Sequence, residues 1–500
     1  MAHRTGKTCS YQETEMKHSR RLARTCAVLL ALLGCQATPA VEVDPGGSGQ
    51  VLLLPLWTTT GGHSTLLNIQ NLHETASYRK IAKLRLRDQE GAVVFSGSLY
   101  FHDPQDAWTA GIGPREGGGS RLISSDETCL LVDGEQGAEP FSGMADLDAE
   151  YGSAEVILMG SGWTVPADQQ FPIQWDVVCS QLADKWNVGE WESNPNTPSI
   201  HEAYQLFAEW QIIQVEGGVV YKVPGVAIDG YSDRVQHTRP GDPLPDLASG
   251  HDTGTDEGKT KSRVCSNGKC REDTWPTPLD AMAAALMVDH FRGSYNINPN
   301  LGAATDLVIN YPLVMYFSER DGLGSPVDHA VPLGHSFVQM ATYDRVGNDR
   351  VPQGCVGVPQ LECWDTEWSA PQPLDPQALP IMAVSFNPAE SQIAPSAVLD
   401  LPGAWRMEFP SENEYQLPPL PSEGSFHARP SSNSLNYGWS MISNEGNGFR
   451  GAPAIPVVFQ RYVNGVLEGS DGVPQRANYS FAFAPAIWAW DITWDDTGED

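Results

Sequence analysis

A short apolar segment near the N-terminus constrains this chain more than any other stretch of its sequence. Residues 26–33 contain no charged side chain, and four basic residues precede them, Lys17, Arg20, Arg21 and Arg24. A basic region, an apolar core of about 7–15 residues and small residues after that core are the parts of an export signal. The core is shorter than the about 20 residues that cross a bilayer. We therefore expect an exported protein, and we assign residues 1–40 to its signal peptide.

The first fifteen residues do not fit such a signal. They are polar and include Glu13 and Glu15. Met16 opens directly on Lys17, as the basic region of an export signal does. We therefore expect translation to begin at Met16.

Two cleavage positions fit the end of the signal. The segment Leu32-Leu33-Gly34-Cys35 resembles the bacterial lipobox, in which the cysteine is lipidated and becomes the first residue, although Leu33 is bulkier than usual. Alternatively, Thr38-Pro39-Ala40 is a small-x-small site that starts the chain at Val41. Lipidation of Cys35 would tether the protein to a membrane, whereas cleavage after Ala40 would release it.

The net charge of the exported part excludes one class of partner. Residues 1–40 hold six lysines and arginines and two glutamates, so residues 41–500 carry 25 basic and 60 acidic side chains, a net charge of −35. Such a surface repels phosphate backbones, and we expect no nucleic-acid binding. It suits an extracytoplasmic protein, and it could attract divalent cations weakly.

Turn-forming residues and short apolar runs predict a mainly β fold. The chain has 48 glycines, 38 prolines and 15 tryptophans. We expect β-sandwich layers, immunoglobulin-like or jelly-roll-like, with long loops and a few short helices. The expected elements of the N-terminal part are strands at 50–57, 65–71, 80–87, 94–101, 107–112 and 154–159, a helix at 176–186, and a hairpin of 206–215 with 219–223.

Three stretches carry more specific expectations. Residues 41–49 look like a Gly/Pro leader before the first strand. The strand at 50–57 is too apolar to have a solvated face. In 80–87, Ala82, Leu84 and Leu86 alternate with Lys83, Arg85 and Arg87, which predicts a half-buried strand with its charged face in water.

A polar segment divides the exported chain. We expect an N-terminal β-sandwich region at 41–228, a polar loop or linker at 229–275, and a C-terminal β-rich region with one helix at 276–500. The helix has Thr277 as its cap and Pro278 at its first position. Its apolar stripe runs on through Leu286 to His290, and Gly293 is a natural stop. We therefore expect His290 to be a core residue of this helix.

Six cysteines remain after Cys9, Cys26 and Cys35 are set aside. An even number in an oxidising compartment predicts disulfides, although six cysteines allow 15 pairings. Local spacing suggests Cys265–Cys270 and Cys355–Cys363, which leaves Cys129–Cys179. The alternative is a zinc site from the last four cysteines, but the seven residues between Cys355 and Cys363 exceed the usual ligand spacing.

Motifs for catalysis or for a bound cofactor are incomplete in this sequence. Residues 254–260 lack the first glycine of a P-loop, and Gly334-His335-Ser336-Phe337-Val338 lacks the last glycine of a nucleophile elbow. We therefore assign no catalytic, cofactor-binding or metal residue. Weak calcium binding stays open, against the alternative of plain surface charge, at two groups of carboxylates, Asp146, Asp148 and Glu150, and Asp252, Asp256 and Glu257.

A row of tryptophans near the C-terminus allows two interpretations. Trp488, Trp490 and Trp494 share one face of an expected strand, and Asp491 and Asp495 share the other. The row could be a flat platform on which sugar rings stack. The alternation also fits the core face of a terminal strand, and we favour this interpretation.

The exported chain resembles an uncharacterised class of exported bacterial cell-surface proteins. The resemblance rests on the order in which several short stretches follow one another along the chain. These stretches are Gly49-Gln50-Val51-Leu52, Asp106-Ala107-Trp108-Thr109-Ala110, Glu155-Val156-Ile157-Leu158-Met159-Gly160, Thr305-Asp306-Leu307-Val308, Tyr311-Pro312, Tyr343-Asp344-Arg345, Tyr437-Gly438-Trp439 and Ile455-Pro456-Val457. The resemblance implies a β-rich secreted or surface-attached protein, and it transfers no activity and no catalytic residue.

These observations lead to one functional expectation and two alternatives. We expect an exported, non-enzymatic structural or adhesive protein of the cell surface or the extracellular space. The first alternative is a carbohydrate-binding or carbohydrate-active protein. The second is a subunit of a larger surface assembly. The partners to consider are a membrane, through Cys35, cell-surface glycans and other surface proteins.

Overall fold

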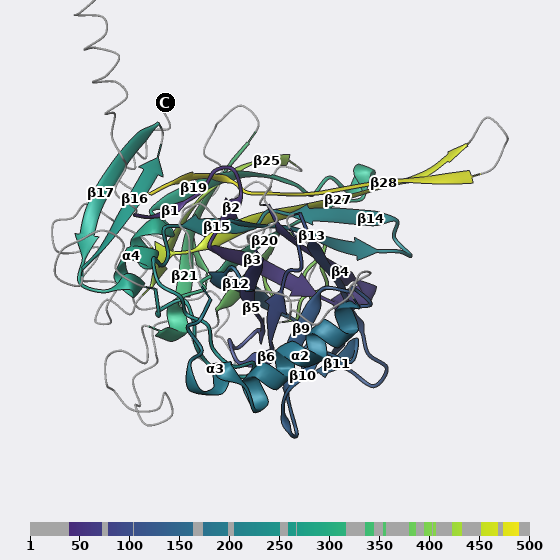
Figure 1. The fold of residues 1–500 in the computed structure, drawn as a ribbon. Helices are drawn as coiled ribbons and strands as arrows, with labels where there is room; N and C mark the ends of the chain where they lie inside the picture. The colour runs from purple at the N-terminus through teal and green to yellow at the C-terminus, as the bar shows by residue number, and fades with distance from the viewer. Residues whose placement is uncertain are drawn as a thin grey trace, which may run out of the picture. The chain divides into compact units, whose positions relative to one another are not determined.

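A computed structural model gives the fold of residues 40–500, which form one compact unit. The structure describes residues 40–72, 79–103, 105–163, 174–198, 205–250, 259–266, 268–316, 336–344, 354–356, 380–386, 395–402, 404–406, 423–432, 452–468 and 474–489. The described chain is mostly β-strands with a few short helices (Figure 1), which confirms the predicted fold class.

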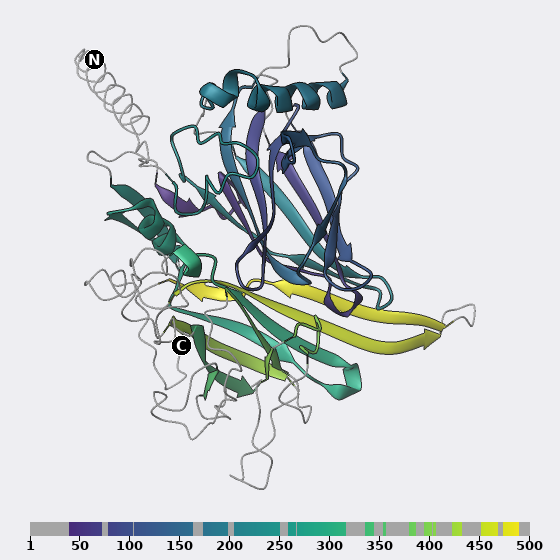
Figure 2. The ribbon, with the colours of Figure 1, turned by 90° about the horizontal axis from the view of Figure 1, so that it is seen from below.

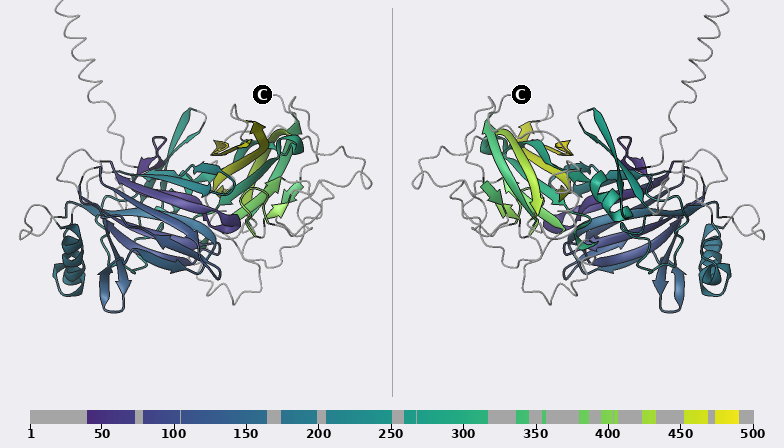
Figure 3. Two further views of the ribbon diagram at one scale, coloured as in Figure 1. Left: turned by 90° about the vertical axis from the view of Figure 1, so that its right-hand side faces the viewer. Right: turned by 90° about the vertical axis from the view of Figure 1, so that its left-hand side faces the viewer.

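Two large sheets face each other and form the first sandwich (Figure 3). The ten-stranded sheet has the order β10 (Gly137–Pro140), β9 (Cys129–Gly134), β6 (Val93–Tyr100), β5 (Lys80–Asp88), β12 (Tyr151–Ser161), β3 (Val51–Thr58), β15 (Val226–Asp229), β1 (Val41–Val43), β16 (Thr260–Ser266) and β17 (Lys269–Trp275). The seven-stranded sheet has the order β11 (Met144–Leu147), β8 (Ser120–Ile123), β7 (Ala107–Pro114), β4 (Ser64–Asn71), β13 (Leu206–Gln214) and β14 (Val219–Val223), and β2 (Ser48–Gly49) also pairs with β13.

Two five-stranded sheets form the second sandwich. One has the order β22 (Gly354–Val356), β21 (Ser336–Asp344), β25 (Glu423–Ser432), β19 (His290–Asn296) and β29 (Ala486–Trp488). The other has the order β24 (Trp405–Arg406), β23 (Ile381–Phe386), β20 (Ala303–Asn310), β27 (Ile455–Glu468) and β28 (Pro474–Phe483). The remaining elements are β18 (Met287–Val288) with β26 (Ala452–Pro453), the helices α2 (Trp175–Asn187), α3 (Glu190–Ser193) and α4 (Pro278–Ala285), and two 3₁₀ turns, Thr60–Gly62 and Pro299–Leu301.

The two sandwiches share apolar side chains. On β20, Leu307 and Ile309 belong to the core of the second sandwich, whereas Val308 between them belongs to the core of the first. Strand β3 divides in the same way, with Leu53 in one core and Leu54 in the other, so it has no solvated face, as its composition predicts. A strand that is buried on both faces joins the layers on either side of it. The chain halves before and after residue 229 therefore pack as one continuous body.

The charged face of β5 is buried, which corrects the expectation that it lies in water. Lys83 is 0 % exposed and Arg85 is 1 % exposed. Lys83 Nζ donates to the carbonyl of Arg239 at 2.9 Å, and Arg85 donates to Glu155 at 3.1 Å and to the carbonyl of Pro245 at 2.6 Å. Residues 239–245 thus cover the strand with carbonyl acceptors, which takes the place of water around the cations. Apolar and charged residues do alternate between the two faces of β5, as predicted, but the charged face is covered by the carbonyl groups of residues 239–245 instead of by water.

Within the segment 229–275, residues 230–250 form a loop, as predicted, but this loop packs against the core, and the segment ends in a hairpin that was not predicted. Tyr231 and Leu247 are 1 % exposed and belong to the core that α4 also joins. Residues 260–275 form the hairpin of β16 and β17, whose strands pair from Thr260 with Trp275 to Ser266 with Lys269. Residues 41–49 likewise form β1 and β2 rather than an irregular leader. Strands β1 and β2 pair with strands far along the chain, and the local sequence does not show such partners.

Helix α4 begins as predicted and ends earlier. The Thr277 hydroxyl accepts from the Asp280 backbone N–H at 3.2 Å, and Pro278 opens the helix. The helix stops at Ala285, and His290 begins β19 instead of extending the helical stripe. Its ring is buried, 3.1 Å from the Asp289 carboxylate. Short buried strands and buried helices give similar apolar runs, which explains the error.

Candidate functional site

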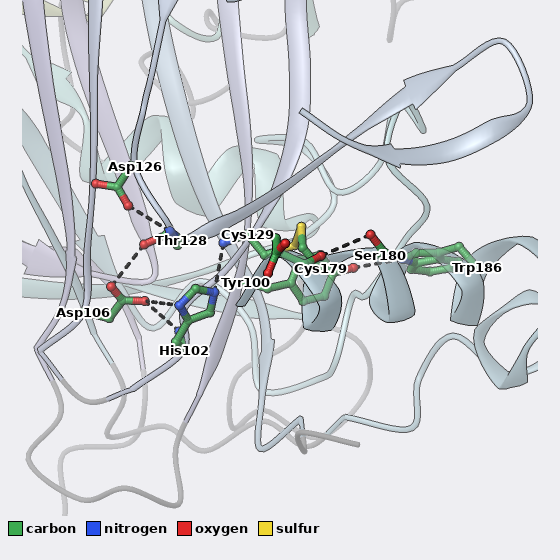
Figure 4. The surroundings of a disulfide bond; sticks show 10 residues. Tyr100, His102, Asp106, Asp126, Thr128, Cys129, Cys179, Ser180 and Trp186 are labelled. Carbon is green, nitrogen blue, oxygen red and sulfur yellow. Dashed lines mark hydrogen bonds and ion pairs between the residues drawn. A yellow bond between two sulfur atoms is a disulfide. The ribbon is translucent and has the colours of Figure 1, made fainter. Parts of the chain in front are cut away.

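A disulfide fastens helix α2 to the ten-stranded sheet. Cys129 is the first residue of β9, and Cys179 lies in the second turn of α2 (Figure 4). Figure 2 shows this helix lying across the ends of strands of the first sandwich. This is the cysteine pair that the sequence left over once Cys265–Cys270 and Cys355–Cys363 were paired by their spacing. The bond places α2 beside the loop that leads into β9.

A second disulfide joins Cys265 to Cys270 across the β16–β17 hairpin, where the two residues are direct partners in the strand register. Cys355 lies in β22, and Cys363 lies outside the described residues, so their pairing stays a prediction. Disulfides persist in oxidising compartments, and both bonds therefore indicate an extracytoplasmic environment. None of the described helices is long and apolar enough to cross a membrane.

His102 and Asp106 hold the loop before β9. The backbone N–H of Cys129 donates to His102 Nε2 at 3.1 Å, which leaves the ring proton on Nδ1, 4.0 Å from Asp106 Oδ2. The same carboxylate oxygen accepts from the His102 backbone N–H at 2.7 Å, and Oδ1 accepts from the Thr128 hydroxyl at 3.1 Å (Figure 4). Burial lowers the pKa of His102 to about 4. The imidazole is therefore neutral near pH 7, and its free lone pair is already used by the backbone.

A second carboxylate fixes the outer part of this loop. Asp126 Oδ2 accepts from the backbone N–H of Thr109 at 3.1 Å and from its hydroxyl at 2.8 Å. Asp126 Oδ1 accepts from the backbone N–H of Thr128 at 2.9 Å. Three donors thus orient the Asp126 side chain and tie the loop to β7. A site built on this loop is preorganised rather than assembled on binding.

The other end of α2 rests on a buried aromatic group. Trp186 Nε1 donates to the Tyr100 hydroxyl at 2.9 Å, and that hydroxyl lies 2.9 Å from His237 Nε2. His237 Nδ1 lies 2.8 Å from the carbonyl of Pro195 and donates to it. Trp191 stacks on the Tyr100 ring at 5.7 Å between centroids. Burial lowers the pKa of His237 to about 3, so this network is uncharged near neutral pH.

A pocket of about 570 Å³ opens between the start of α2 and the loop before β9. It combines aromatic, hydroxyl and carboxylate side chains, and its lining is Trp108, Ser124, Asp126, Glu127, Thr128, Cys129, Leu130, Pro140, Phe141, Gln174, Trp175, Asp176, Cys179 and Ser180. Its volume is within the range of about 300–1,000 Å³ of small-molecule sites. The disulfide lies in its wall, so the bond also fixes the distance between its two sides.

The chemistry of this pocket favours binding. The nearest histidine–carboxylate pair, His102 with Asp106, uses its basic nitrogen to accept a backbone N–H. A general base must instead reach the proton of a substrate with a free lone pair. The remaining carboxylates are Asp126, which three donors orient, and Glu127 and Asp176, for which the described part of the chain offers no hydrogen-bond partner.

Trp488, the one described tryptophan of the proposed sugar platform, lies outside this pocket. Trp488 is in β29 at the edge of its sheet, and its ring stacks on His290 at 4.9 Å between centroids and 9° between planes. Trp490 and Trp494 lie outside the described residues, as does Cys35. Trp488 therefore has an aromatic partner within the chain, and the prediction that the three tryptophans form a flat platform stays untested.

Two of the carboxylates proposed as a weak calcium site, Asp146 and Asp148, bind arginines, whereas Glu150 is exposed and forms no ion pair with any described residue. Asp146 accepts from Arg121 at 2.7 Å, and Asp148 accepts from Arg115 at 3.0 Å. Asp252, Asp256 and Glu257 lie outside the described residues. Within the described ranges, no group of three or more histidine, cysteine or carboxylate side chains is arranged to hold a metal ion.

Apart from Cys129 and Cys179, the residues that line this pocket were not predicted as a site from the sequence. Asp126 and Glu127 precede Cys129 by three and two residues, and Trp175 and Asp176 precede Cys179 by four and three. Their proximity follows once Cys129 is paired with Cys179. That pairing was available from the sequence, and it was the one signal that could have located the site.

Comparison with known proteins supplies no further constraint. No protein-family model matches this chain, and no curated protein and no solved structure matches it significantly.

Proposed function

We propose that this chain is an exported, non-enzymatic structural or adhesive protein of the cell surface or extracellular space. The observation that carries the proposal is the Cys129–Cys179 bond, which builds an oxidised crosslink into the wall of a binding pocket. Such a bond suits an extracytoplasmic compartment. Two sandwiches that share core side chains add the rigidity that a structural or adhesive role requires.

The position of β1 supports a tether through Cys35 over release at Ala40. Ala40 is 7 % exposed and Val41 is 1 % exposed, with β1 paired to β15 on one side and to β16 on the other. A methyl group at Gly230 would come within 2.1 Å of the Ala40 carbonyl, so this carbonyl is tightly packed. Cleavage after Ala40 would remove that contact and would create a charged amino group at a buried position, which is costly. Cleavage at Cys35 keeps both residues in the fold.

Fractionation of the native cells tests this proposal. We expect the protein in the membrane or surface fraction, with radiolabelled fatty acid attached and its cysteines resistant to alkylation until a reductant is added. A Cys35→Ser variant should lose the label and move to the soluble extracytoplasmic fraction. A cytoplasmic protein with free thiols would overturn the proposal.

The second candidate function is carbohydrate binding, and the pocket beside α2 favours it. Trp175 and Phe141 lie in its lining with the Gln174 amide and the Ser180 hydroxyl, a combination that can stack on a sugar ring and bind its hydroxyls. A glycan array with the purified protein tests this candidate. Selective binding to one glycan, lost when Trp175 is replaced by Ala, would place it first.

A further inference from the structure

We propose that the pocket between α2 and the β9 loop binds an organic cation, an ammonium or guanidinium group on a partly apolar stem. This inference rests on the proposed adhesive function, because it names the chemistry by which such a protein would hold a partner. A lysine or arginine side chain of a surface protein and a free amine share this chemistry. The observations that support it are the charge, the aromatic walls and the rigidity of the pocket.

The charge of the lining is entirely negative. Three of its side chains are carboxylates, Asp126, Glu127 and Asp176, and among the described residues that line the pocket none is a lysine or an arginine. The exported chain around it carries a net charge of −35. A cleft lined by one sign of charge concentrates its field and attracts the opposite charge. An anionic ligand such as a sulfated or phosphorylated glycan would be repelled.

The carboxylates differ in what they can offer a ligand. Asp126 already accepts three hydrogen bonds from Thr109 and Thr128, so it supplies fixed negative charge. Glu127 and Asp176 are exposed, and the described ranges contain no hydrogen-bond partner for either side chain. Both can therefore turn toward a cation without breaking an internal bond. A neutral sugar would gain hydrogen bonds here but no Coulomb attraction.

The aromatic walls suit the apolar stem and the charged end of such a ligand. Trp175 is half-buried, and His102 covers one face of its ring at 3.8 Å between centroids. The indole is thereby held in place, and only its other face or its edge remains for a ligand. A cation over an indole ring gains about 0.5–2 kcal/mol. Phe141 adds apolar surface to the same pocket.

Titration calorimetry on the full exported chain with both disulfides formed tests this inference. The probes are cadaverine for the free amine, a peptide with one central lysine or arginine for the protein-borne cation, and a neutral oligosaccharide. We expect one cation to bind at a single site and to bind more weakly as salt is raised. A preference for the peptide over cadaverine would identify a protein partner, and the reverse would identify a small amine.

Paired variants separate the pocket from general surface charge. We expect Glu127→Gln with Asp176→Asn to weaken cation binding about tenfold, since each removes a partly exposed ion pair. The matched control is Glu116→Gln with Glu135→Gln, which removes the same charge from exposed turns outside the pocket and should leave binding unchanged. Equal weakening in both variants, no binding of either cation at millimolar concentration, or binding of the oligosaccharide alone would overturn the inference. These outcomes are independent of fractionation, which tests the proposed function itself.

Discussion

The imidazole of His102 lies flat on the indole of Trp175, with 3.8 Å between the ring centroids and 3° between the planes. His102 stands just after β6 and Trp175 begins α2, so this contact connects the sheet to the helix in addition to the Cys129–Cys179 bond. It also places a buried, neutral histidine under a pocket lined by carboxylates. The stack therefore holds Trp175 in the wall of the pocket, and its histidine makes the stability of the fold depend on pH.

We predict that His102 destabilises the fold as the pH falls. Burial lowers its pKa from 6.5 to about 4, so between these values the unfolded chain binds a proton that the folded chain does not. Stability from this group is complete above about pH 6.5 and declines toward pH 4, by at most about 1.4 kcal/mol per pH unit. Urea unfolding of the wild type and of His102→Gln over this range measures the effect. The difference in unfolding free energy between the two should shrink as the pH falls, and a constant difference would refute the prediction.

The two disulfides should contribute unequally to stability. The Cys129–Cys179 bond joins residues 50 positions apart, whereas Cys265–Cys270 joins residues 5 positions apart. Loop-closure entropy gives about 4 kcal/mol for the longer loop and about 2 kcal/mol for the shorter one. Removing each pair by alanine substitution and measuring urea unfolding tests this order. An equal loss in both double variants would contradict it.

The Cys129–Cys179 double variant should also loosen the pocket. We expect faster proteolysis near the start of α2, because the bond fixes this helix against β9. The Cys265–Cys270 variant serves as the control, since its hairpin contributes no residue to the pocket. Unchanged cleavage near α2 would show that the aromatic contacts alone hold the helix.

Local patterns were enough to predict most of the first sandwich and the start of α4. The apolar run 50–57 predicted β3, and the hairpin expected from 206–215 with 219–223 is formed by β13 and β14, because apolar runs and turn residues act over a few positions. The burial of Lys83, the order in 229–250 and the early end of α4 depend on partners far along the chain. The pocket depends on the same kind of contact, since the Cys129–Cys179 bond joins α2 to β9 across 50 positions of the sequence.

Glu155 should be important for the stability of the sheet. Its carboxylate accepts from Arg85 at 3.1 Å and from Arg87 at 3.0 Å, and its side chain is 4 % exposed. Replacing it by glutamine leaves two guanidinium groups without their shared anion, and loss of one partner of a buried pair costs about 3–5 kcal/mol. Chemical denaturation measures this cost. The control is Glu209→Gln, which removes the partly exposed partner of Lys222 and should cost under about 1 kcal/mol. Similar losses for both would refute the role of burial.

Gly230 should be essential for the docking of β1. Its φ is +65°, and a Cβ there would come within 2.1 Å of the Ala40 carbonyl. Gly218 has nearly the same φ, +63°, but nothing within 4 Å of a Cβ. Gly218→Ala should therefore cost only the about 1–2 kcal/mol of a left-handed residue, whereas Gly230→Ala should cost more and expose β1 to protease. Thermal unfolding and limited proteolysis compare the two, and equal effects would show that β1 is not packed as described.

The N-terminal peptide of the protein from its native cells tests export and anchoring together. Mass spectrometry of this peptide should find a chain that begins at a lipid-modified Cys35 and retains Ala40, as the buried start of β1 requires. An unmodified chain that begins at Val41 would contradict the tether. A chain that still carries residues 17–33 without modification would contradict export itself.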